Sequence, residues 1–195
     1  MNNFQIPSFS AFFATITTKN VIRNKVLIRK AFNFAATQHA DQKRKFTDKP
    51  YFVHPVAVAQ LLKPFADEVI IAGLLHDVIE DADTSAEEIA AQFGPEVAFL
   101  VLGCTKDPTN QKTPMDILEE AAAQDKRVIY IKLADRFDNF GDNILNMKSK
   151  TIHKYHNETP ILLNLAKEYG IDFLVEEIRS RLTLIADWLA ENKRK

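Results

Sequence analysis

An apolar run that ends in four ionisable side chains is the feature that most constrains the fold of this chain. The run occupies residues 74–81 and has the sequence LLHDVIED. Its apolar residues continue the helical spacing of the segment before it, so we expect a buried helix over residues 69–79. The polar end of that helix is then carried into the interior of the protein.

The four ionisable residues of the run would form two pairs on such a helix. His76 and Glu80 are i,i+4 neighbours, and so are Asp77 and Asp81. Unpaired charges at a buried helix end are costly, and a divalent cation is a common remedy. Taken alone, however, a His-Asp dipeptide is more often a hydrogen-bonded core pair, followed here by an ordinary acidic helix end.

Composition limits the classes of protein to which the chain can belong. Its 195 residues suit one well-buried domain, and a formal net charge of -1 provides no overall field for nucleic acid or a membrane surface. A single cysteine, Cys104, excludes an internal disulfide and suits a reducing compartment such as the cytoplasm, where we expect a packed thiol. Residues 1–24 are expected to form a packed or frayed N-terminal extension, with the domain itself over residues 25–195.

Helical patterns dominate the chain and predict an all-α, single-domain architecture. No convincing alternating strand, internal repeat or glycine-rich phosphate loop is present. The β-branched segment 128–133 is expected to be helical and to deliver Asp135 and Asn139 on one face, with Asp138 less directly on it. Besides 69–79, helices are predicted over residues 25–40, from Pro55 onward, and over 85–93, 95–102, 113–123, 126–139, 159–169 and 172–191.

Two further segments carry candidate site residues. Residues 41–45 form a largely basic cluster, which alone would most often be a solvated surface. His54 precedes Pro55, and proline in the first turn of a helix would fix this histidine at a helix entrance.

Together, these residues make a set that suits one metal ion and phosphoester hydrolysis. His54, His76, Asp77 and Asp135 offer two nitrogens and two oxygens, which suits manganese, iron or zinc with open coordination positions better than a closed structural site. A metal of this kind binds phosphate oxygen and generates hydroxide from water. The remaining predicted roles fall to four side chains: Glu80 and Asp81 would orient or deprotonate the water, and Arg44 and Lys45 would bind a polyphosphate.

These segments, in their order along the chain, resemble the hydrolase domain of the RelA/SpoT alarmone family. The resemblance covers residues 25–182, and an ordered set of matches is far more specific than one motif. The matching segments are His39 to Lys45, Pro50 to Pro55, Leu74 to Asp81, Phe93-Gly94, Thr105-Lys106, Ile131 to Arg136 and Glu158-Thr159.

The resemblance implies an HD-type helical fold, one Mn²⁺ ion and removal of the 3′-pyrophosphate of guanosine tetra- or pentaphosphate (ppGpp or pppGpp). No segment matches the synthetase domain, so a stand-alone small alarmone hydrolase is expected. By position, the resemblance assigns the same metal ligands and acidic pair as above, with Arg44, Lys45 and Asn139 contacting the nucleotide. Lys106, His153 and Lys154 are weaker phosphate-contact candidates, and His39 is expected to support the site.

The sequence departs from the family pattern after Asp135. Asp138 replaces a histidine and Gly141 replaces a basic residue, while Asp41 stands where glycine is common. The loss of positive charge near a polyanion pocket bears on substrate identity but leaves the metal set complete.

Two other functions remain compatible with the same residues. The chain would hydrolyse another phosphorylated nucleotide such as NADPH if the base and ribose contacts favour it, because metal ligands do not set that choice. A non-catalytic nucleotide-sensing module is the second alternative, although every ligand and both acids are retained. In each case the expected partner is a small nucleotide, with no nucleic acid and no membrane, and the sequence leaves the oligomeric state open.

Overall fold

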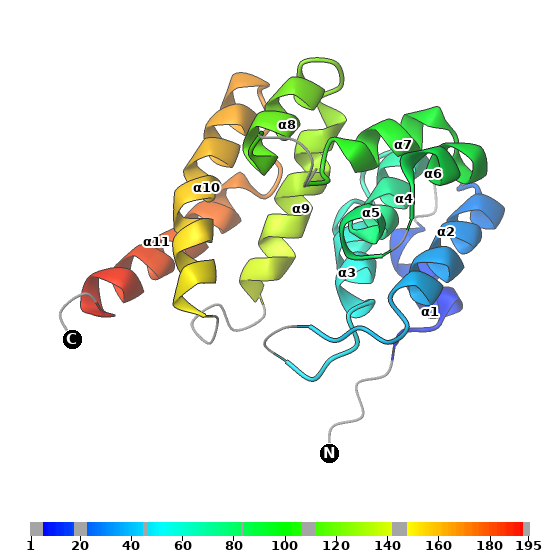
Figure 1. Cartoon of the computed structure of the whole chain (residues 1–195), viewed down its shortest axis with the longest axis horizontal. Helices are drawn as coiled ribbons and strands as arrows, with labels where there is room; N and C mark the ends of the chain where they lie inside the picture. Colours follow the sequence, from blue (N-terminus) through cyan, green and yellow to red (C-terminus); the bar gives the residue numbers. More distant parts are fainter. Residues whose placement is uncertain are drawn as a thin grey trace.

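The protein is an assembly of α-helices. The computed structural model describes residues 6–17, 23–44, 47–82, 84–106, 112–141 and 148–192, and within these ranges it contains no β-strand. The predicted all-α class is confirmed, and Figure 1 shows the arrangement. The helices are α1 (Phe9–Ile16), α2 (Lys25–Gln38), α3 (Val53–Leu61), α4 (Asp67–Leu75), α5 (Val78–Asp81), α6 (Ala86–Phe93), α7 (Pro95–Leu102), α8 (Pro114–Ala122), α9 (Arg127–Gly141), α10 (Ser149–Glu168) and α11 (Val175–Asn192).

Helix α4 forms the centre of the core. Every residue from Val69 to Leu75 is buried, and the helix packs against α2, α3, α7 and α9. A helix that is apolar on all sides must be enclosed by other elements. An added Cβ at Gly73 would lie 2.6 Å from Leu62 Cδ1, so glycine suits the close approach of α4 to the end of α3.

The predicted helix over residues 69–79 is interrupted, which corrects the sequence interpretation. Helix α4 ends at Leu75, and the separate short helix α5 begins at Val78 after His76 and Asp77. His76 Nδ1 lies 2.9 Å from the carbonyl oxygen of Gly73, and this bond holds the imidazole against the end of α4. His76 therefore lies between the two helices, whereas Glu80 belongs to α5.

Helix α9 connects the two halves of the molecule. It packs against α3, α4 and α7 on one side and against α8, α10 and α11 on the other (Figure 1). Its first half buries Val128, Ile129, Ile131 and Leu133, so the β-branched segment is helical as predicted. These apolar contacts carry Asp135 into the interior.

Helix α10 begins ten residues before the predicted start. A Thr-Pro dipeptide is typical of a helix N-terminus, yet Pro160 lies inside α10. Thr159 is fully buried, donates a hydrogen bond to the carbonyl oxygen of Tyr155 and accepts one from Arg136 Nη1. Together with the buried Ile152 and Leu162, these contacts hold the helix together through the proline.

The first helix is part of the core. Phe12 and Ile16 of α1 are fully buried, and the ring of Phe12 stacks on Phe32 of α2 with centroids 5.3 Å apart. The segment expected to be packed or frayed is therefore packed over α1.

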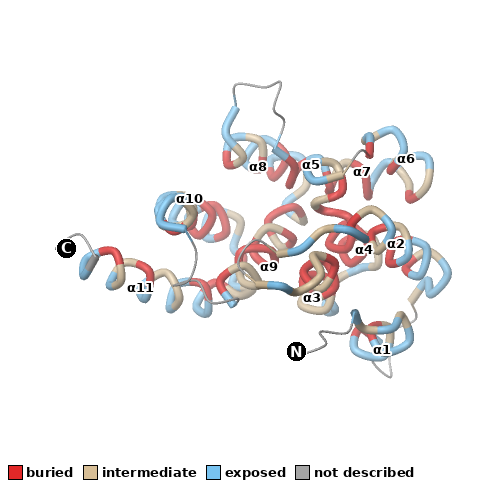
Figure 2. The backbone as a smooth tube through the Cα atoms, turned by 60° about the horizontal axis from the view of Figure 1, so that its bottom comes forward, coloured by how far each residue is buried: buried red, intermediate tan, exposed pale blue. Residues whose placement is uncertain are grey.

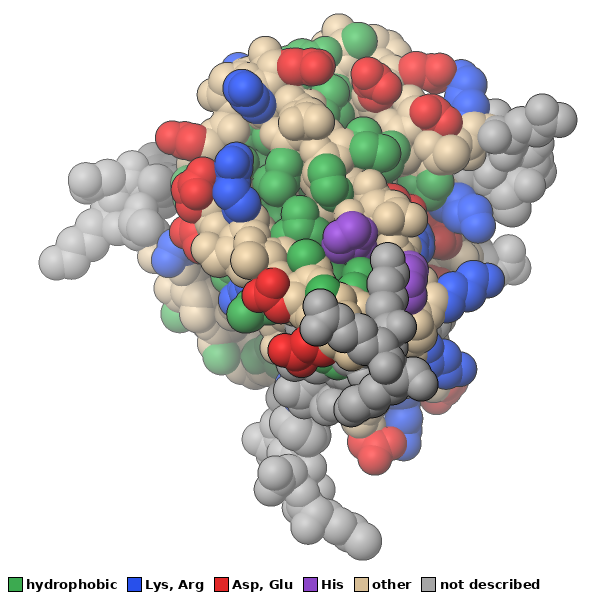
Figure 3. Space-filling view, turned by 90° about the vertical axis from the view of Figure 1, so that its left-hand side faces the viewer, with side chains coloured by type: hydrophobic (Ala, Val, Ile, Leu, Met, Phe, Trp, Pro, Cys, Tyr) green, Lys and Arg blue, Asp and Glu red, His purple; other side chains and the backbone are tan. Residues whose placement is uncertain are grey.

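Burial is concentrated where the central helices meet, whereas α11 buries one side and exposes the other (Figure 2). The face that includes α10 and α11 carries hydrophobic side chains bordered by charged ones (Figure 3). Ile161 of α10 and Leu184 of α11 are among the described large apolar residues that are exposed. Of the helices described, none has both the length and the apolar character needed to cross a bilayer.

Candidate active site

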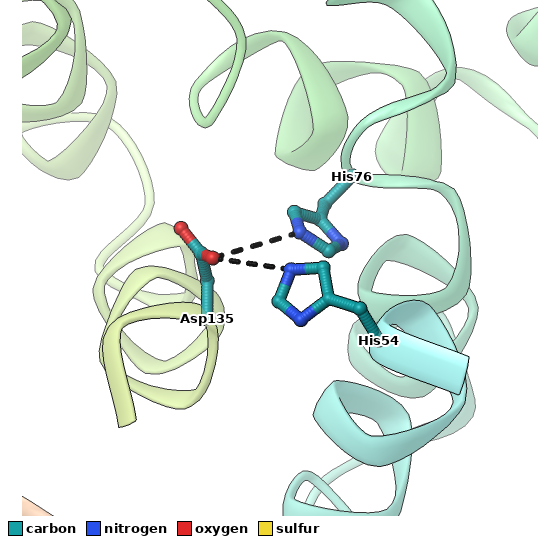
Figure 4. A group of neighbouring side chains, drawn as sticks. All are labelled: His54, His76 and Asp135. Carbon is teal, nitrogen blue, oxygen red and sulfur yellow. Dashed lines mark ion pairs between the residues drawn. The ribbon is translucent and has the colours of Figure 1, made fainter. Parts of the chain in front are cut away.

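Three helical segments bring His54, His76 and Asp135 together. His54 lies in the first turn of α3, His76 follows the end of α4, and Asp135 lies in α9. Figure 4 shows the three side chains pointing toward one another. Asp135 Oδ1 is 3.3 Å from His54 Nε2 and 3.9 Å from His76 Nε2. Each residue offers one ligand atom within 4.8 Å of the others, and all three are buried.

Asp77 completes the set of predicted ligands. Its Oδ2 atom lies 3.0 Å from His76 Nε2 and 3.6 Å from His54 Nε2. The two-nitrogen, two-oxygen set expected from the sequence therefore meets at one place in the structure.

The two imidazole rings are fixed so that their Nε2 atoms face the carboxylates. Since backbone carbonyl and carboxylate oxygens accept, His76 Nδ1 donates to Gly73 and His54 Nδ1 donates to Asp138 Oδ2 at 2.6 Å. His76 Nε2 is buried without a hydrogen bond, although Asp77 is near it. Such an atom, aimed at two carboxylates, fits a metal ligand.

The electrostatics of this cluster favour added positive charge. Burial lowers the pKa of His54, but hydrogen bonds with Asp135 and Asp138 outweigh it and raise the pKa to about 9. The pKa of His76 is also raised, because the nearby Asp77 outweighs burial. Burial raises the pKa of Asp77 and Asp135, yet neighbouring cationic groups lower both below the usual range. The donor set and its charge thus fit a divalent metal ion.

A cavity of about 570 Å³ opens beside the cluster. It is lined by most of the predicted site residues, namely Arg44, His54, Asp77, Glu80, Asp81, Asp135 and Asn139. Lys106 and Lys154, the weaker phosphate-contact candidates, also line it, together with Lys150. Lys45 lies outside the described residues, and His153 instead interacts with the backbone oxygen of Ser149.

The two acids of α5 reach the cavity with different partners. Tyr51 Oη donates to Asp77 Oδ2 at 2.6 Å and also lies 3.0 Å from Asp81 Oδ2. Burial, followed by the charge of Asp77, raises the pKa of Tyr51 well above its usual range. Glu80 Oε2 accepts a bond from the backbone nitrogen of Lys106 at 3.3 Å. Tyr51 therefore links a candidate ligand to a candidate base, a role that sequence reasoning missed.

His39 supports this corner of the site from behind. Its ring is buried against Tyr51, with centroids 4.9 Å apart, and its Nδ1 atom is 2.8 Å from Gln42 Oε1. Gln42 Nε2 in turn donates to the backbone oxygen of Asp81. This placement agrees with the supporting role expected for His39.

Two residues of α9 that were not assigned a role also contact the candidate ligands. Lys132 Nζ lies 3.0 Å from Asp135 Oδ2, and the i,i+3 spacing is the signal that could have predicted this pair. Asp138 was expected to lie less directly on the face of Asp135, but it contacts His54 and also lies 2.7 Å from Arg44 Nη1. The aspartate that departs from the family pattern is thus part of the site.

A family model described as "HD domain" matches residues 31–171. A guanosine-3′,5′-bis(diphosphate) 3′-pyrophosphohydrolase of Aquifex aeolicus is 46% identical over 119 residues, which is 57% of this chain and 17% of the relative. A probable enzyme of the same name from Synechocystis is 48% identical over 58% of this chain and 16% of the relative. A GTP pyrophosphokinase of Brucella ovis is 36% identical over 80% of this chain and 22% of the relative. The chain spans about a fifth of the length of these relatives.

Solved structures share the fold over most of their length. One, described as a metazoan ortholog of SpoT that hydrolyzes ppGpp and plays a role in starvation responses, superposes with a TM-score of 0.72 at 26% identity. The match covers 84% of this chain and 98% of that one. A protein of Listeria monocytogenes gives a TM-score of 0.58 at 26% identity, over 71% of this chain and 99% of that one. These similarities confirm the predicted HD-type fold and the resemblance to RelA/SpoT proteins.

Proposed function

Because this chain belongs to the HD domain family, we propose that it is a metal-dependent hydrolase that removes the 3′-pyrophosphate of ppGpp or pppGpp. The products are GDP or GTP and pyrophosphate. The names of the Aquifex and Synechocystis relatives and the described activity of the metazoan structure support this substrate class. Residues 25–195 carry the activity as one domain, on whose core α1 packs.

The observation that carries the proposal is the meeting of two imidazole nitrogens and two carboxylates beside a cavity lined by cationic side chains. His54, His76, Asp77 and Asp135 hold the metal, and we propose Mn²⁺ as the ion. When bound, such an ion neutralises phosphate charge and lowers the pKa of a water molecule. The carboxylates are held in place by contacts within the protein, Asp77 by Tyr51 and Asp135 by Lys132.

Glu80 and Asp81 orient the attacking water molecule and accept its proton. Both carboxylates line the cavity, and each is oriented by a contact outside α5, Glu80 by the Lys106 amide and Asp81 by Tyr51. The carboxylate in this position would accept a proton from the water while the water oxygen bonds to the 3′ phosphorus and the bond between that phosphorus and the ribose 3′ oxygen breaks. The ribose 3′ oxygen takes up a proton and becomes the 3′ hydroxyl of GDP or GTP. The departing pyrophosphate carries the charge that the cations must meet.

Cationic and amide side chains bind the nucleotide. Arg44 and Asn139 lie next to the ligands, where Arg44 Nη2 donates to Asn139 Oδ1 at 3.2 Å. Lys106, Lys150 and Lys154 line the cavity and are exposed, so they can meet phosphate oxygens. Lys45 remains part of the proposed binding set, although it lies outside the described residues. We also propose a reducing, cytoplasmic setting, which the single cysteine of the sequence supports.

The proposal is tested by turnover of ppGpp by the purified chain in the presence of Mn²⁺, with products separated by anion exchange. We expect GDP and pyrophosphate in equal amounts, and no reaction in excess chelator. NADPH is assayed beside ppGpp under the same conditions, since the metal ligands do not select the base or ribose.

The outcomes separate the alternatives. Release of phosphate from NADPH without turnover of ppGpp would assign the site to another nucleotide. Manganese binding without turnover of either compound would favour a nucleotide sensor. Protein that neither binds manganese nor reacts would contradict the proposed metal site itself.

A further inference from the structure

Asp138 joins a candidate metal ligand to a candidate substrate contact. One oxygen, Oδ2, lies 2.6 Å from His54 Nδ1 and 2.7 Å from Arg44 Nη1. All three side chains are enclosed, with exposed fractions of 19% for Asp138, 2% for His54 and 10% for Arg44. An ionised carboxylate has no hydrogen to donate, so Asp138 accepts a hydrogen bond from both His54 Nδ1 and Arg44 Nη1.

This contact sets the direction in which His54 presents its free nitrogen. A carboxylate that accepts the Nδ1 hydrogen leaves Nε2 as the atom available for a metal, and it fixes the plane of the ring. Nε2 of His54 then faces Asp135 Oδ1 at 3.3 Å and Asp77 Oδ2 at 3.6 Å. His76 has its ring fixed by a backbone carbonyl instead, so the two imidazoles are oriented by different means.

Arg44 fixes the carboxylate in turn. Its Nη1 atom bonds Asp138, while Nη2 donates to Asn139 Oδ1, and Asn139 Nδ2 donates to Asp135 Oδ1. Asp138 and Asn139 are adjacent on α9, three and four residues after Asp135. The guanidinium therefore lies across two side chains, each of which bonds one candidate ligand.

We propose that Asp138 is a positioning residue that orients His54 for metal binding, with Arg44 holding the carboxylate in place. The inference rests on the metal site of the proposed function and not on the identity of the nucleotide. Asp138 itself is not among the residues that line the cavity, so it acts through His54 rather than on the substrate.

The affinity for Mn²⁺, measured by calorimetry without nucleotide, tests this proposal. Asp138→Asn keeps the size of the side chain and one acceptor oxygen, whereas Asp138→Leu keeps a similar size with no acceptor. We expect Asp138→Leu to weaken Mn²⁺ binding about 10- to 100-fold, the range found when a partner of a ligating histidine is removed. Asp138→Asn should retain most of the affinity, because its oxygen still accepts the Nδ1 hydrogen. Circular dichroism and thermal unfolding confirm that each variant is folded.

Two controls sharpen the comparison. Asp125→Asn removes a carboxylate that also pairs with an arginine, Arg127, and has a similar exposed fraction of 22%. Like Asp138 it does not line the cavity, but its side chain bonds Arg127 and not a candidate ligand. It should leave the Mn²⁺ affinity within about twofold, since it makes no contact with the ligands. Arg44→Ala leaves Asp138 in place, so it should lower the Mn²⁺ affinity by a smaller factor than Asp138→Leu does.

The proposal is overturned if folded Asp138→Leu protein binds Mn²⁺ as wild type does, or if Asp138→Asn loses as much affinity as Asp138→Leu. The part assigned to Arg44 is overturned if folded Arg44→Ala protein binds Mn²⁺ as wild type does, because the carboxylate would then be held in place without the arginine. A wild-type chain that binds Mn²⁺ but does not turn over ppGpp would contradict the proposed substrate and leave the role of Asp138 to be decided by these affinities.

Discussion

The two sides of the cavity differ in how completely the protein fixes them. The ligand wall consists of His54, Asp77 and Asp135, which line the cavity, and of His76 next to them. These side chains are buried or nearly so, and the two imidazoles are fixed through Nδ1. The basic wall, formed by Lys106, Lys150 and Lys154, is exposed, and Lys154 has a side chain that is 54% accessible. The side chains of the ligand wall are fixed by contacts within the protein, whereas the basic wall consists of long side chains in contact with solvent.

This difference suggests that the ligand wall serves the chemical step and that the basic wall serves the selection of the substrate. Fixed dipoles and charges in an enclosed site act on a reaction without reorganising, so the ligand wall suits bond breaking. Exposed lysines adapt to the position of a phosphate but contribute little individually. We therefore expect substitutions in the ligand wall to remove activity and substitutions in the basic wall to adjust substrate binding.

The largest effect is expected for His54→Ala, which removes a proposed metal ligand and the partner of Asp138. Loss of the metal would remove several kcal/mol of charge stabilisation, so turnover of ppGpp should fall by more than about 1,000-fold. Calorimetry with Mn²⁺ and the anion-exchange assay check the two consequences together. Asp48→Asn, a change at a side chain that is 97% exposed, serves as the control. Wild-type manganese binding by His54→Ala would remove His54 from the ligand wall.

A smaller and more selective effect is expected for Glu80→Gln. The amide oxygen can still accept the bond from the Lys106 amide, so the local structure should persist while the proton acceptor is lost. We expect kcat to fall roughly 100- to 10,000-fold, the usual contribution of a general base, with Mn²⁺ affinity unchanged. A variant with normal kcat would leave Asp81 as the base, and one that loses the metal would show that Glu80 belongs to the ligand wall.

The meeting of the four side chains of the ligand wall is also what the sequence predicts well, while their role as metal ligands stays a prediction. His76 and Asp77 end an apolar run, His54 precedes a proline at a helix start, and Asp135 follows a β-branched segment. Each side chain is delivered by a strongly apolar element whose burial is clear from its periodicity. The all-α class follows from the same patterns and is confirmed.

Contacts between distant segments could not be predicted in this way. Tyr51 reaches Asp81, and Asp138 reaches His54 and Arg44, through packing that no local pattern encodes. At two points the local sequence pattern predicts the wrong helix boundary. Pro160 suggests that a helix starts there, but α10 continues through the proline because neighbouring residues are buried. The apolar periodicity predicts one helix over residues 69–79, but α4 ends at Leu75.

The basic wall is expected to respond more weakly. Lys154→Ala removes one exposed cation, worth at most about 1 kcal/mol, so KM for ppGpp should rise roughly two- to fivefold with kcat little changed. The rise should shrink as salt is added, because exposed charges are screened. Lys167→Ala changes a lysine of the same helix that does not line the cavity, and it should leave KM unaltered. A fall in kcat with unchanged KM would show that Lys154 acts in the transition state instead.

The last prediction concerns Cys104 and leaves turnover unchanged, because it tests only whether the enclosed side of the cavity stays closed to solvent. This thiol lines the cavity but is only 7% exposed, and its sulfur lies 3.8 Å from the Val128 carbonyl oxygen. Burial raises the pKa of Cys104 from 9.0 to about 12, because the charged thiolate is poorly solvated there.

Alkylation by iodoacetamide at pH 8, followed by mass spectrometry, measures this directly. A pKa raised by three units lowers the thiolate fraction about 1,000-fold, so the native protein should react that much more slowly than the unfolded chain. The sign of the linked stability follows, because between pH 9 and 12 the unfolded state loses this proton first and unfolding becomes easier. Rapid alkylation of native protein at pH 8 would mean that the ligand wall opens to solvent. The ligand wall would then not be more rigidly enclosed than the basic wall, which would contradict the comparison made above.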